Sequence, residues 1–123
     1  MAIDLERLFI ESGALKEGHF LLASGRHSDK YLEKFDLLRN PVATSQVLEP
    51  LAAQLADWDI DIIVGPTTGG ILLAFELGRQ LGLPAAYAER KGEGLSGREI
   101  KRSTVFPEGG KVFVIDDILT TGG

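Results

Sequence analysis

The second half of the chain alternates short apolar runs with one helical stretch, and this alternation limits the possible folds more than any other feature. Ile60–Val64 and Lys111–Ile115 are rich in β-branched residues, as buried parallel strands are, and Pro84–Ala88 predicts a third strand. Gly69–Leu81 has helical spacing. This order predicts an α/β fold with a mostly parallel sheet flanked by helices. The core positions expected on the helix are Ile71, Leu72, Phe75 and Leu81.

The first part of the chain predicts smaller elements. A helix is expected over Asp4–Ser12, with Gly13 as its stop. Two extended stretches, His19–Ala23 and Lys30–Phe35, are expected on either side of a turn at Ser24–Ser28.

A second helix is expected to begin at Asn40-Pro41, where a capping side chain precedes a proline. Apolar residues continue at helical spacing through Val47–Leu55, and Pro50 is expected to kink this helix or split it. His19 and His27 stand too far apart in the sequence to indicate a metal site, so we expect surface or hydrogen-bonded histidines.

Composition narrows the function classes. The 123 residues fit one domain, and the absence of cysteine excludes disulfides and favours a reducing cytoplasm. A net charge of −5 argues against a nucleic-acid partner, which requires a positive field. No apolar run approaches the ~18 residues that would indicate a membrane span.

The strongest motif is the stretch Val112-Phe-Val-Ile-Asp-Asp-Ile-Leu-Thr-Thr-Gly-Gly123. A buried strand runs directly into Asp116 and Asp117, whose oxygens can accept hydrogen bonds from a sugar diol or hold a metal. The hydroxyl and glycine N–H groups that follow can close around a phosphate. These groups come from Thr120, Thr121, Gly122 and Gly123. Such an order indicates a site for a ribose 5-phosphate; the alternative is a strand capped by an Asp-Asp turn.

A second motif, Val64-Gly-Pro-Thr-Thr-Gly-Gly-Ile71, takes a strand through Gly65-Pro66 into a helix that starts at Gly69-Gly70. Free N–H groups at the start of a helix bind anions. Taken alone, the motif is equally typical of a plain turn between strand and helix.

Together these motifs resemble the type I phosphoribosyltransferases, and the resemblance covers essentially all 123 residues in the family's order. It implies that Asp116 and Asp117 face the ribose hydroxyls of phosphoribosyl pyrophosphate (PRPP). Thr120–Gly123 would begin the 5-phosphate loop. The pyrophosphate loop would hold Thr67, Thr68 and Gly69 at its contact positions.

A basic segment follows the second strand. Five basic side chains against two acids give residues 90–102 a local net charge of +3. This segment is either a seat for a small anion or a solvated, charge-rich loop. Its opening Arg90-Lys91 resembles the start of the family's mobile catalytic loop, so Gly92–Thr104 is expected to be poorly ordered without ligand.

The family usually places a further lysine in the middle of this loop. The chain offers Arg98, Lys101 and Arg102 there, and we favour Lys101. The residues expected to be catalytic are Lys101, Arg90, Lys91 and Asp117.

The stretch Gly13–Ser28, with its Ser-Gly-x-x-Ser turn, resembles the N-terminal segment of the orotate phosphoribosyltransferases. Ser24 and Gly25 are the expected substrate contacts there, and Ala23 stands where some members have lysine. The resemblance implies a base-covering segment over residues 1–38 and a PRPP-binding core over residues 39–123.

The implied reaction is transfer of phosphoribosyl from PRPP to orotate, giving orotidine 5-monophosphate and pyrophosphate, a step of pyrimidine biosynthesis. Mg²⁺ would be held mainly by PRPP and water, with no protein metal site. The family works as a homodimer whose loops reach the neighbouring active site. No nucleic-acid or membrane partner is implied.

Three alternatives stay open. A purine phosphoribosyltransferase shares the Asp-Asp motif, and so does a regulator that binds PRPP without turning it over. The third is an inactive fragment, because members of the family continue past the position of Gly123 through a further helix and strands. We therefore expect a C-terminally truncated chain that binds PRPP weakly and is a poor enzyme by itself.

Overall fold

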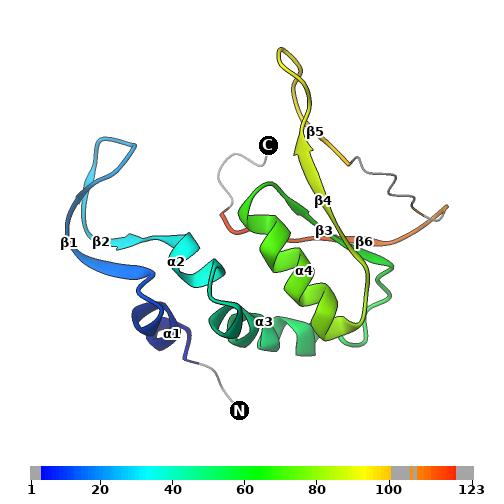
Figure 1. The fold of residues 1–123 in the computed structure, drawn as a ribbon, viewed down its shortest axis with the longest axis horizontal. Helices are drawn as coiled ribbons and strands as arrows, with labels where there is room; N and C mark the ends of the chain where they lie inside the picture. The colour runs from blue at the N-terminus through cyan, green and yellow to red at the C-terminus, as the bar shows by residue number, and fades with distance from the viewer. Residues whose placement is uncertain (1–3, 101–105, 107, 119–123) are drawn as a thin grey trace. The chain divides into compact units, whose positions relative to one another are not determined.

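The computed structural model of the protein describes residues 4–100, 106 and 108–118 (Figure 1). The chain divides into two compact units, an N-terminal unit of residues 1–47 and a C-terminal unit of residues 48–123. No helix in the described parts of the chain is long and apolar enough to cross a membrane.

The N-terminal unit is built around an antiparallel hairpin. Helix α1 (Leu5–Glu11) is capped by Asp4, whose side chain accepts a hydrogen bond from the Arg7 N–H. Strands β1 (Leu15–Leu21) and β2 (His27–Leu32) then pair across a turn, which confirms the predicted hairpin, although each strand begins and ends earlier than expected. A small core lies beside them. It consists of Ala14, Leu37 and Ala43, with Phe9 and Val47 packed against it.

One prediction for this unit is wrong. Lys34 and Phe35 do not extend a strand but begin a short helix, α2 (Lys34–Leu38). The side chain of Glu33 accepts a hydrogen bond from the Phe35 N–H at 3.3 Å, and this cap starts the helix.

Helix α3 (Pro41–Leu55) begins where the sequence predicts, with Asn40 Oδ1 accepting a hydrogen bond from the Ala43 N–H at 3.2 Å. Of the kink or split expected at Pro50, the split does not occur, because one helix runs through this position. Pro50 lies on the exposed side of the helix, and Leu48 and Leu55 are buried on either side of it in the sequence. Burial of these two leucines stabilises one continuous helix, and water can reach the carbonyl that Pro50 leaves without a helical donor.

The C-terminal unit contains a four-stranded sheet with the order β5-β4-β3-β6. Strand β3 (Ile62–Pro66) lies in the middle and pairs in parallel with β4 (Ala85–Arg90) and with β6 (Val112–Val114). Helix α4 (Gly69–Leu81) connects β3 to β4. This arrangement confirms the predicted α/β organisation with a mostly parallel sheet.

Helix α4 packs on the sheet through a narrower stripe than expected. Leu72 is 41% exposed and Phe75 is 72% exposed, so the prediction that both lie in the core is wrong. Small residues allow the backbones of helix and sheet to approach closely, and the buried stripe of the helix leaves out Leu72 and Phe75. The buried residues of α4 are Gly69, Gly70, Leu73, Ala74, Leu77 and Gly78.

The closest approach is between the end of β3 and the start of α4. A Cβ atom on Gly65 would lie 1.8 Å from the carbonyl oxygen of Gly70, and a Cβ on Gly70 would lie 2.7 Å from Pro66 Cδ. Only hydrogen fits at these two positions. Gly82 ends the helix in the left-handed conformation at φ 70°.

Strand β5 (Arg98–Glu99) lies inside the segment that the sequence predicts as a loop. It pairs antiparallel with β4, with Arg90 opposite Arg98, and the resulting hairpin projects from the sheet (Figure 1). Gly94 and Gly97 have φ angles of 80° and 86°, a conformation that glycine adopts readily, and they form the tight turn between the two strands. Arg98 and Glu99 lie in the second strand, residues 101–104 lie outside the described residues, and poor order of this segment without ligand stays a prediction.

The start of β6 is fixed to the chain that precedes β3. The Lys111 N–H donates to Asp61 Oδ2 at 2.8 Å, and the Asp61 N–H donates to the Lys111 carbonyl at 2.8 Å. Next to this exchange, the rings of Trp58 and Phe113 meet edge to face with centroids 6.2 Å apart. These contacts set the register of β6, and the register determines where the Asp116-Asp117 pair emerges.

Candidate active site

The strand order brings the two predicted motifs to the same edge of the sheet. From β3 the chain passes to β4 on one side and later returns to β6 on the other side of β3. Ligands of α/β sheets bind beyond the carboxyl ends of the strands where the order reverses in this way. The residues that follow β3 and β6 are Thr67–Gly70 and Asp116–Asp117.

Two contacts show that these ends lie close together. The Ile115 N–H donates to the Val64 carbonyl at 3.0 Å, which continues the β3–β6 pairing up to the residue before Asp116. A Cβ atom on Gly70 would lie 3.1 Å from the Ile115 carbonyl oxygen. The end of β6 therefore passes directly by the start of α4.

The Thr67–Gly70 turn leads into the first turn of α4. The Thr67–Thr68 peptide bond is cis, and the Thr67 N–H donates to the Ala88 carbonyl at 2.9 Å. Thr68 precedes the helix, and its side chain makes no capping hydrogen bond. The first N–H groups of a helix have no partner within the helix, so this turn can bind an anion.

The two carboxylates after β6 are oriented by neighbouring backbone groups. Asp116 Oδ1 accepts a hydrogen bond from the Asp117 N–H at 2.8 Å, and Asp117 Oδ1 accepts one from the Ile118 N–H at 2.9 Å. Asp116 is exposed and Asp117 is half-buried. Two acceptor groups held next to each other in this way can bind neighbouring hydroxyl groups of a sugar.

The electrostatics of the pair favour a ligand that donates hydrogen bonds. Partial loss of solvent around its carboxylate raises the pKa of Asp116, and the hydrogen bond and negative charge of Asp117 add to this rise. The backbone hydrogen bond from Asp117 and the positive charge of Arg98 act in the opposite direction. Hydroxyl donors from a ligand would relieve the repulsion between the two carboxylates.

Arg98 contacts the Thr67–Gly70 turn, although the sequence favoured Lys101 over it. Its Nη1 donates to Thr67 Oγ1 at 2.6 Å and lies 3.5 Å from the Ala88 carbonyl oxygen. The sequence showed Arg98 as one of three loop cations, with Lys101 favoured. The Gly94 and Gly97 turn was the available signal, because a turn there folds Arg98 back beside β4.

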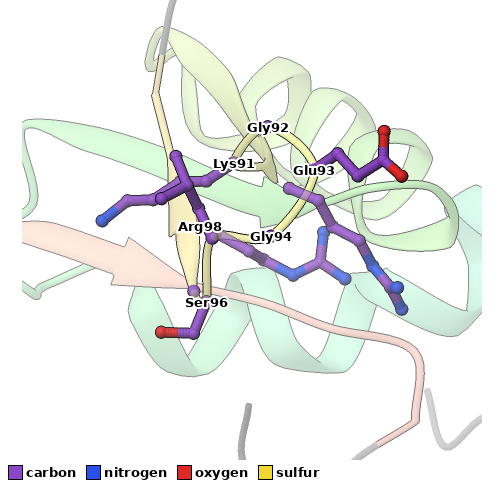
Figure 2. Close-up of a pocket in the computed structure, with 9 residues that line it drawn as sticks. Lys91, Gly92, Glu93, Gly94, Ser96 and Arg98 are labelled. Carbon is purple, nitrogen blue, oxygen red and sulfur yellow. The ribbon is translucent and has the colours of Figure 1, made fainter.

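Arg90 and Lys91, at the end of β4, line a pocket of about 480 Å³ together with the other residues of the segment 90–98 (Figure 2). Its cations are Arg90, Lys91 and Arg98, and Glu93 is its one acid. Lys91 and Arg98 leave the hairpin in opposite directions in Figure 2. The hairpin thus presents positive charge on both sides, and only Arg98 among the three has a hydrogen bond to the Thr67–Gly70 turn.

The remaining predicted residues lie elsewhere. Ser24 and Gly25 form the β1–β2 turn of the N-terminal unit, where the Gly25 N–H donates to the Leu22 carbonyl at 2.9 Å. Five predicted site residues fall outside the described residues. They are Lys101, Thr120, Thr121, Gly122 and Gly123.

The two histidines are closer than their spacing suggests. An irregularity in β1 between Glu17 and Phe20 accompanies a contact in which His19 Nε2 and His27 Nδ1 are 2.7 Å apart. The expected hydrogen-bonded histidines are therefore confirmed, although the argument from sequence distance was wrong. Within residues 4–100, 106 and 108–118, no group of three or more metal-ligating side chains is present.

Comparison with known proteins agrees with the family that the motifs resemble. The sequence profile of the phosphoribosyl transferase domain matches residues 42–123. Over 117 residues, 95% of this chain, the sequence is 40% identical to an orotate phosphoribosyltransferase of Caldicellulosiruptor bescii. The chain spans 60% of the length of the curated relatives that it matches.

Solved structures share the fold. An orotate phosphoribosyltransferase from Aeropyrum pernix superimposes with a TM-score of 0.70 at 29% identity, covering 93% of this chain and 64% of that one. An adenine phosphoribosyltransferase from Thermoanaerobacter pseudethanolicus superimposes with a TM-score of 0.69 at 22% identity, covering 98% and 74%. These likenesses confirm the predicted fold, and the second shows that the fold alone does not separate the two substrate classes.

Proposed function

Because the chain belongs to the phosphoribosyl transferase domain family, as its motifs predict, we propose that it supplies the PRPP site of an enzyme that transfers phosphoribosyl to orotate. One observation carries the proposal: the Asp116-Asp117 pair after β6 lies beside the Thr67–Gly70 turn that opens α4. The two carboxylates can accept hydrogen bonds from a diol, and the neighbouring helix start can bind an anion. This combination suits a ribose that carries a pyrophosphate.

In this proposal Asp116 and Asp117 accept hydrogen bonds from the ribose hydroxyls. Thr67, Thr68 and Gly69 bind the pyrophosphate through backbone N–H and hydroxyl groups. Thr120, Thr121, Gly122 and Gly123 close on the 5-phosphate. The phosphate-bearing end and the sugar are then held by different loops, which fixes the direction in which the reacting carbon faces.

The described residues suit a metal that arrives with the ligand. Asp116 and Asp117 are the carboxylates beside the Thr67–Gly70 turn, and carboxylate oxygens accept hydrogen bonds from water bound to Mg²⁺. A Mg²⁺ ion held mainly by PRPP oxygens and water would fit this pair of carboxylates. The two acids would contact only water molecules bound to the ion. The ion would neutralise part of the pyrophosphate charge.

The proposed chemistry is displacement at the ribose carbon. The bond from this carbon to pyrophosphate breaks, the electron pair leaves with the pyrophosphate oxygen, and a nitrogen of orotate forms the new bond. Catalysis then rests on positioning and charge neutralisation. Arg90, Lys91 and Lys101 are the proposed cations, and Asp117 steadies the sugar as positive charge develops on it.

The choice of orotate rests on the 40% identity to an orotate phosphoribosyltransferase and on the Ser24-Gly25 turn of the N-terminal unit. We assign the base-covering role to residues 1–38, the PRPP-binding role to residues 39–123, and the location to the cytoplasm. A homodimer with loops exchanged between active sites is part of the same proposal.

A substrate panel tests this function. The purified protein is incubated with PRPP, Mg²⁺ and either orotate, adenine, hypoxanthine or uracil, and nucleotide formation is followed by chromatography. Orotidine 5-monophosphate from orotate alone, at the low rate expected of this chain by itself, is the expected result. Turnover of adenine or hypoxanthine but not orotate would assign a purine enzyme, and PRPP binding without turnover of any base would assign a binding role.

A further inference from the structure

The two histidines of the chain meet on the surface of the β1–β2 hairpin. His19 lies on β1 and His27 begins β2, and the sequence contains no other histidine and no cysteine. His19 Nε2 and His27 Nδ1 are 2.7 Å apart, and both residues are exposed. The rings are tilted by 51° with centroids 4.8 Å apart, so nitrogen faces nitrogen and the rings do not stack. Every imidazole that this chain can offer to a ligand is thus in one place.

One extra residue in β1 brings the two rings to the same face of the hairpin. If the register of the first part of β1 continued, His19 would lie opposite Ser28, on the other face from His27. The register instead shifts by one residue, and Leu21 pairs with His27. His19 lies two residues before Leu21 and therefore shares its face. Bulges of this kind redirect a side chain and are common next to functional sites.

Two neutral imidazoles at this distance can replace their mutual hydrogen bond by a shared metal ion. Each neutral ring carries one N–H and one lone pair. A shift of the N–H to the other nitrogen of the donor ring leaves a lone pair on both facing nitrogens. Metal ions bind imidazole nitrogen at about 2.0–2.1 Å, so two adjacent ligands of one ion lie roughly 3 Å apart. Small side-chain rotations at an exposed pair can supply the difference from 2.7 Å.

We propose that His19 and His27 together bind one divalent metal ion of the class that imidazole favours, Zn²⁺, Ni²⁺ or Cu²⁺. In the part of the chain that the structure describes, no third histidine or carboxylate completes the cluster, so water fills the other positions and the ion binds more weakly than at a four-ligand structural site. The ion joins the two strands that the Ser24-Gly25 turn connects, and it stiffens the hairpin. This inference does not depend on the proposed function.

Isothermal titration calorimetry with Ni²⁺ tests the site on untagged protein, because a histidine tag would add competing ligands. Excess Mg²⁺ in the buffer occupies carboxylates, which favour such hard cations. One ion per chain is expected. His19→Gln and His27→Gln should each weaken Ni²⁺ binding about tenfold or more, because even the outer partners of metal ligands contribute that much. The control is Asp59→Asn, which removes an exposed carboxylate of the C-terminal unit and should leave the affinity within about twofold.

The double variant separates a shared site from two independent imidazoles. With a shared ion, the loss of either ring removes most of the affinity, so the double variant should bind little more weakly than either single variant. Independent rings would bind two ions per wild-type chain, and each single variant would keep one of them with unchanged affinity. That pattern would overturn the inference. Affinity within twofold of wild type in either single variant, or no Ni²⁺ binding by the wild-type protein, would do the same.

Two further measurements do not need activity. Cu²⁺ is paramagnetic, so small amounts of it broaden the NMR signals of the rings that bind it, and the two histidines give few ring signals to follow. Both rings of the wild-type protein should broaden together, and broadening of one ring alone would overturn the shared site. Ni²⁺ should also raise the melting temperature of the wild-type protein but not that of the double variant, because an ion that binds the folded hairpin stabilises it. Equal shifts in both proteins would place the ion elsewhere.

Discussion

Replacement of Gly65 by alanine should be among the most damaging small changes that this chain can suffer. The added Cβ atom would lie 1.8 Å from the carbonyl oxygen of Gly70 and 2.3 Å from its carbonyl carbon, whereas non-bonded carbon atoms normally stay about 3.5–4.0 Å apart. Both opposing atoms belong to the backbone of a buried helix start, so no side chain can rotate away. The end of β3 and the start of α4 would have to separate.

The size of the effect follows from this forced separation. Overpacking typically costs 1–3 kcal/mol, and a clash with backbone places Gly65→Ala at about 3 kcal/mol or more. In a chain of this size such a loss lowers the melting temperature by roughly 10 °C or more. Thermal and urea unfolding followed by circular dichroism would measure it.

Other glycines provide a graded control series. A Cβ on Gly78 would lie 2.8 Å from the Leu83 carbonyl oxygen, so Gly78→Ala should be intermediate, while Gly92 has no atom within 4 Å of its Cβ position. Gly92→Ala should therefore change the unfolding free energy by no more than about 0.5 kcal/mol. If Gly65→Ala melted within about a degree of Gly92→Ala, the close packing of β3 on α4 would be refuted.

Three further predictions concern the site and the N-terminal core. Asp117→Asn should weaken PRPP binding by roughly 1.5–3 kcal/mol in calorimetry without lowering the melting temperature, and unchanged affinity would remove Asp117 from the ribose site. Because the pKa of Asp116 is raised in the folded protein, its protonated form favours the folded state, and this stabilisation is lost as the pH rises through the folded pKa. Asp116→Asn should therefore melt at a higher temperature than wild type at neutral pH, with the difference vanishing near pH 3; a constant difference across this range would contradict the reasoning. Thr44 is 3% exposed and donates to the Leu37 carbonyl at 3.0 Å, so Thr44→Val should cost about 1–3 kcal/mol in urea unfolding, and an unchanged midpoint would show that this hydrogen bond does not matter.

The elements that the sequence predicted well are those whose burial is encoded locally. Ile62, Ile63 and Val64 are all buried in the central strand, and a continuous apolar run is the direct sign of such a position. The bounds of α4 also match, because glycine residues mark both of its ends. Two of its four expected core positions, Leu72 and Phe75, were wrong, because the helix buries the stripe that contains its glycines together with Leu73 and Leu77.

The features that the sequence missed depend on neighbours distant in the chain. Strand β5 has only two residues, too few to show an alternation of apolar and polar side chains. It forms because the edge of β4 offers backbone hydrogen-bond partners. The contact of Arg98 with Thr67 follows from the register of that hairpin, which no local pattern determines. The Asp116-Asp117 motif was recognisable by itself, but its position beside the Thr67–Gly70 turn results from the order of the strands.

The edge-to-face contact between Trp58 and Phe113 gives the molecule a spectroscopic reporter. Trp58 is the single tryptophan of the chain, and 61% of it is exposed, so its emission reports on one place and is sensitive to solvent there. Its partner ring belongs to β6, the strand that leads into Asp116. Intrinsic fluorescence therefore follows the order of the strand that leads into the proposed ribose-binding acids, with no label attached near the proposed site.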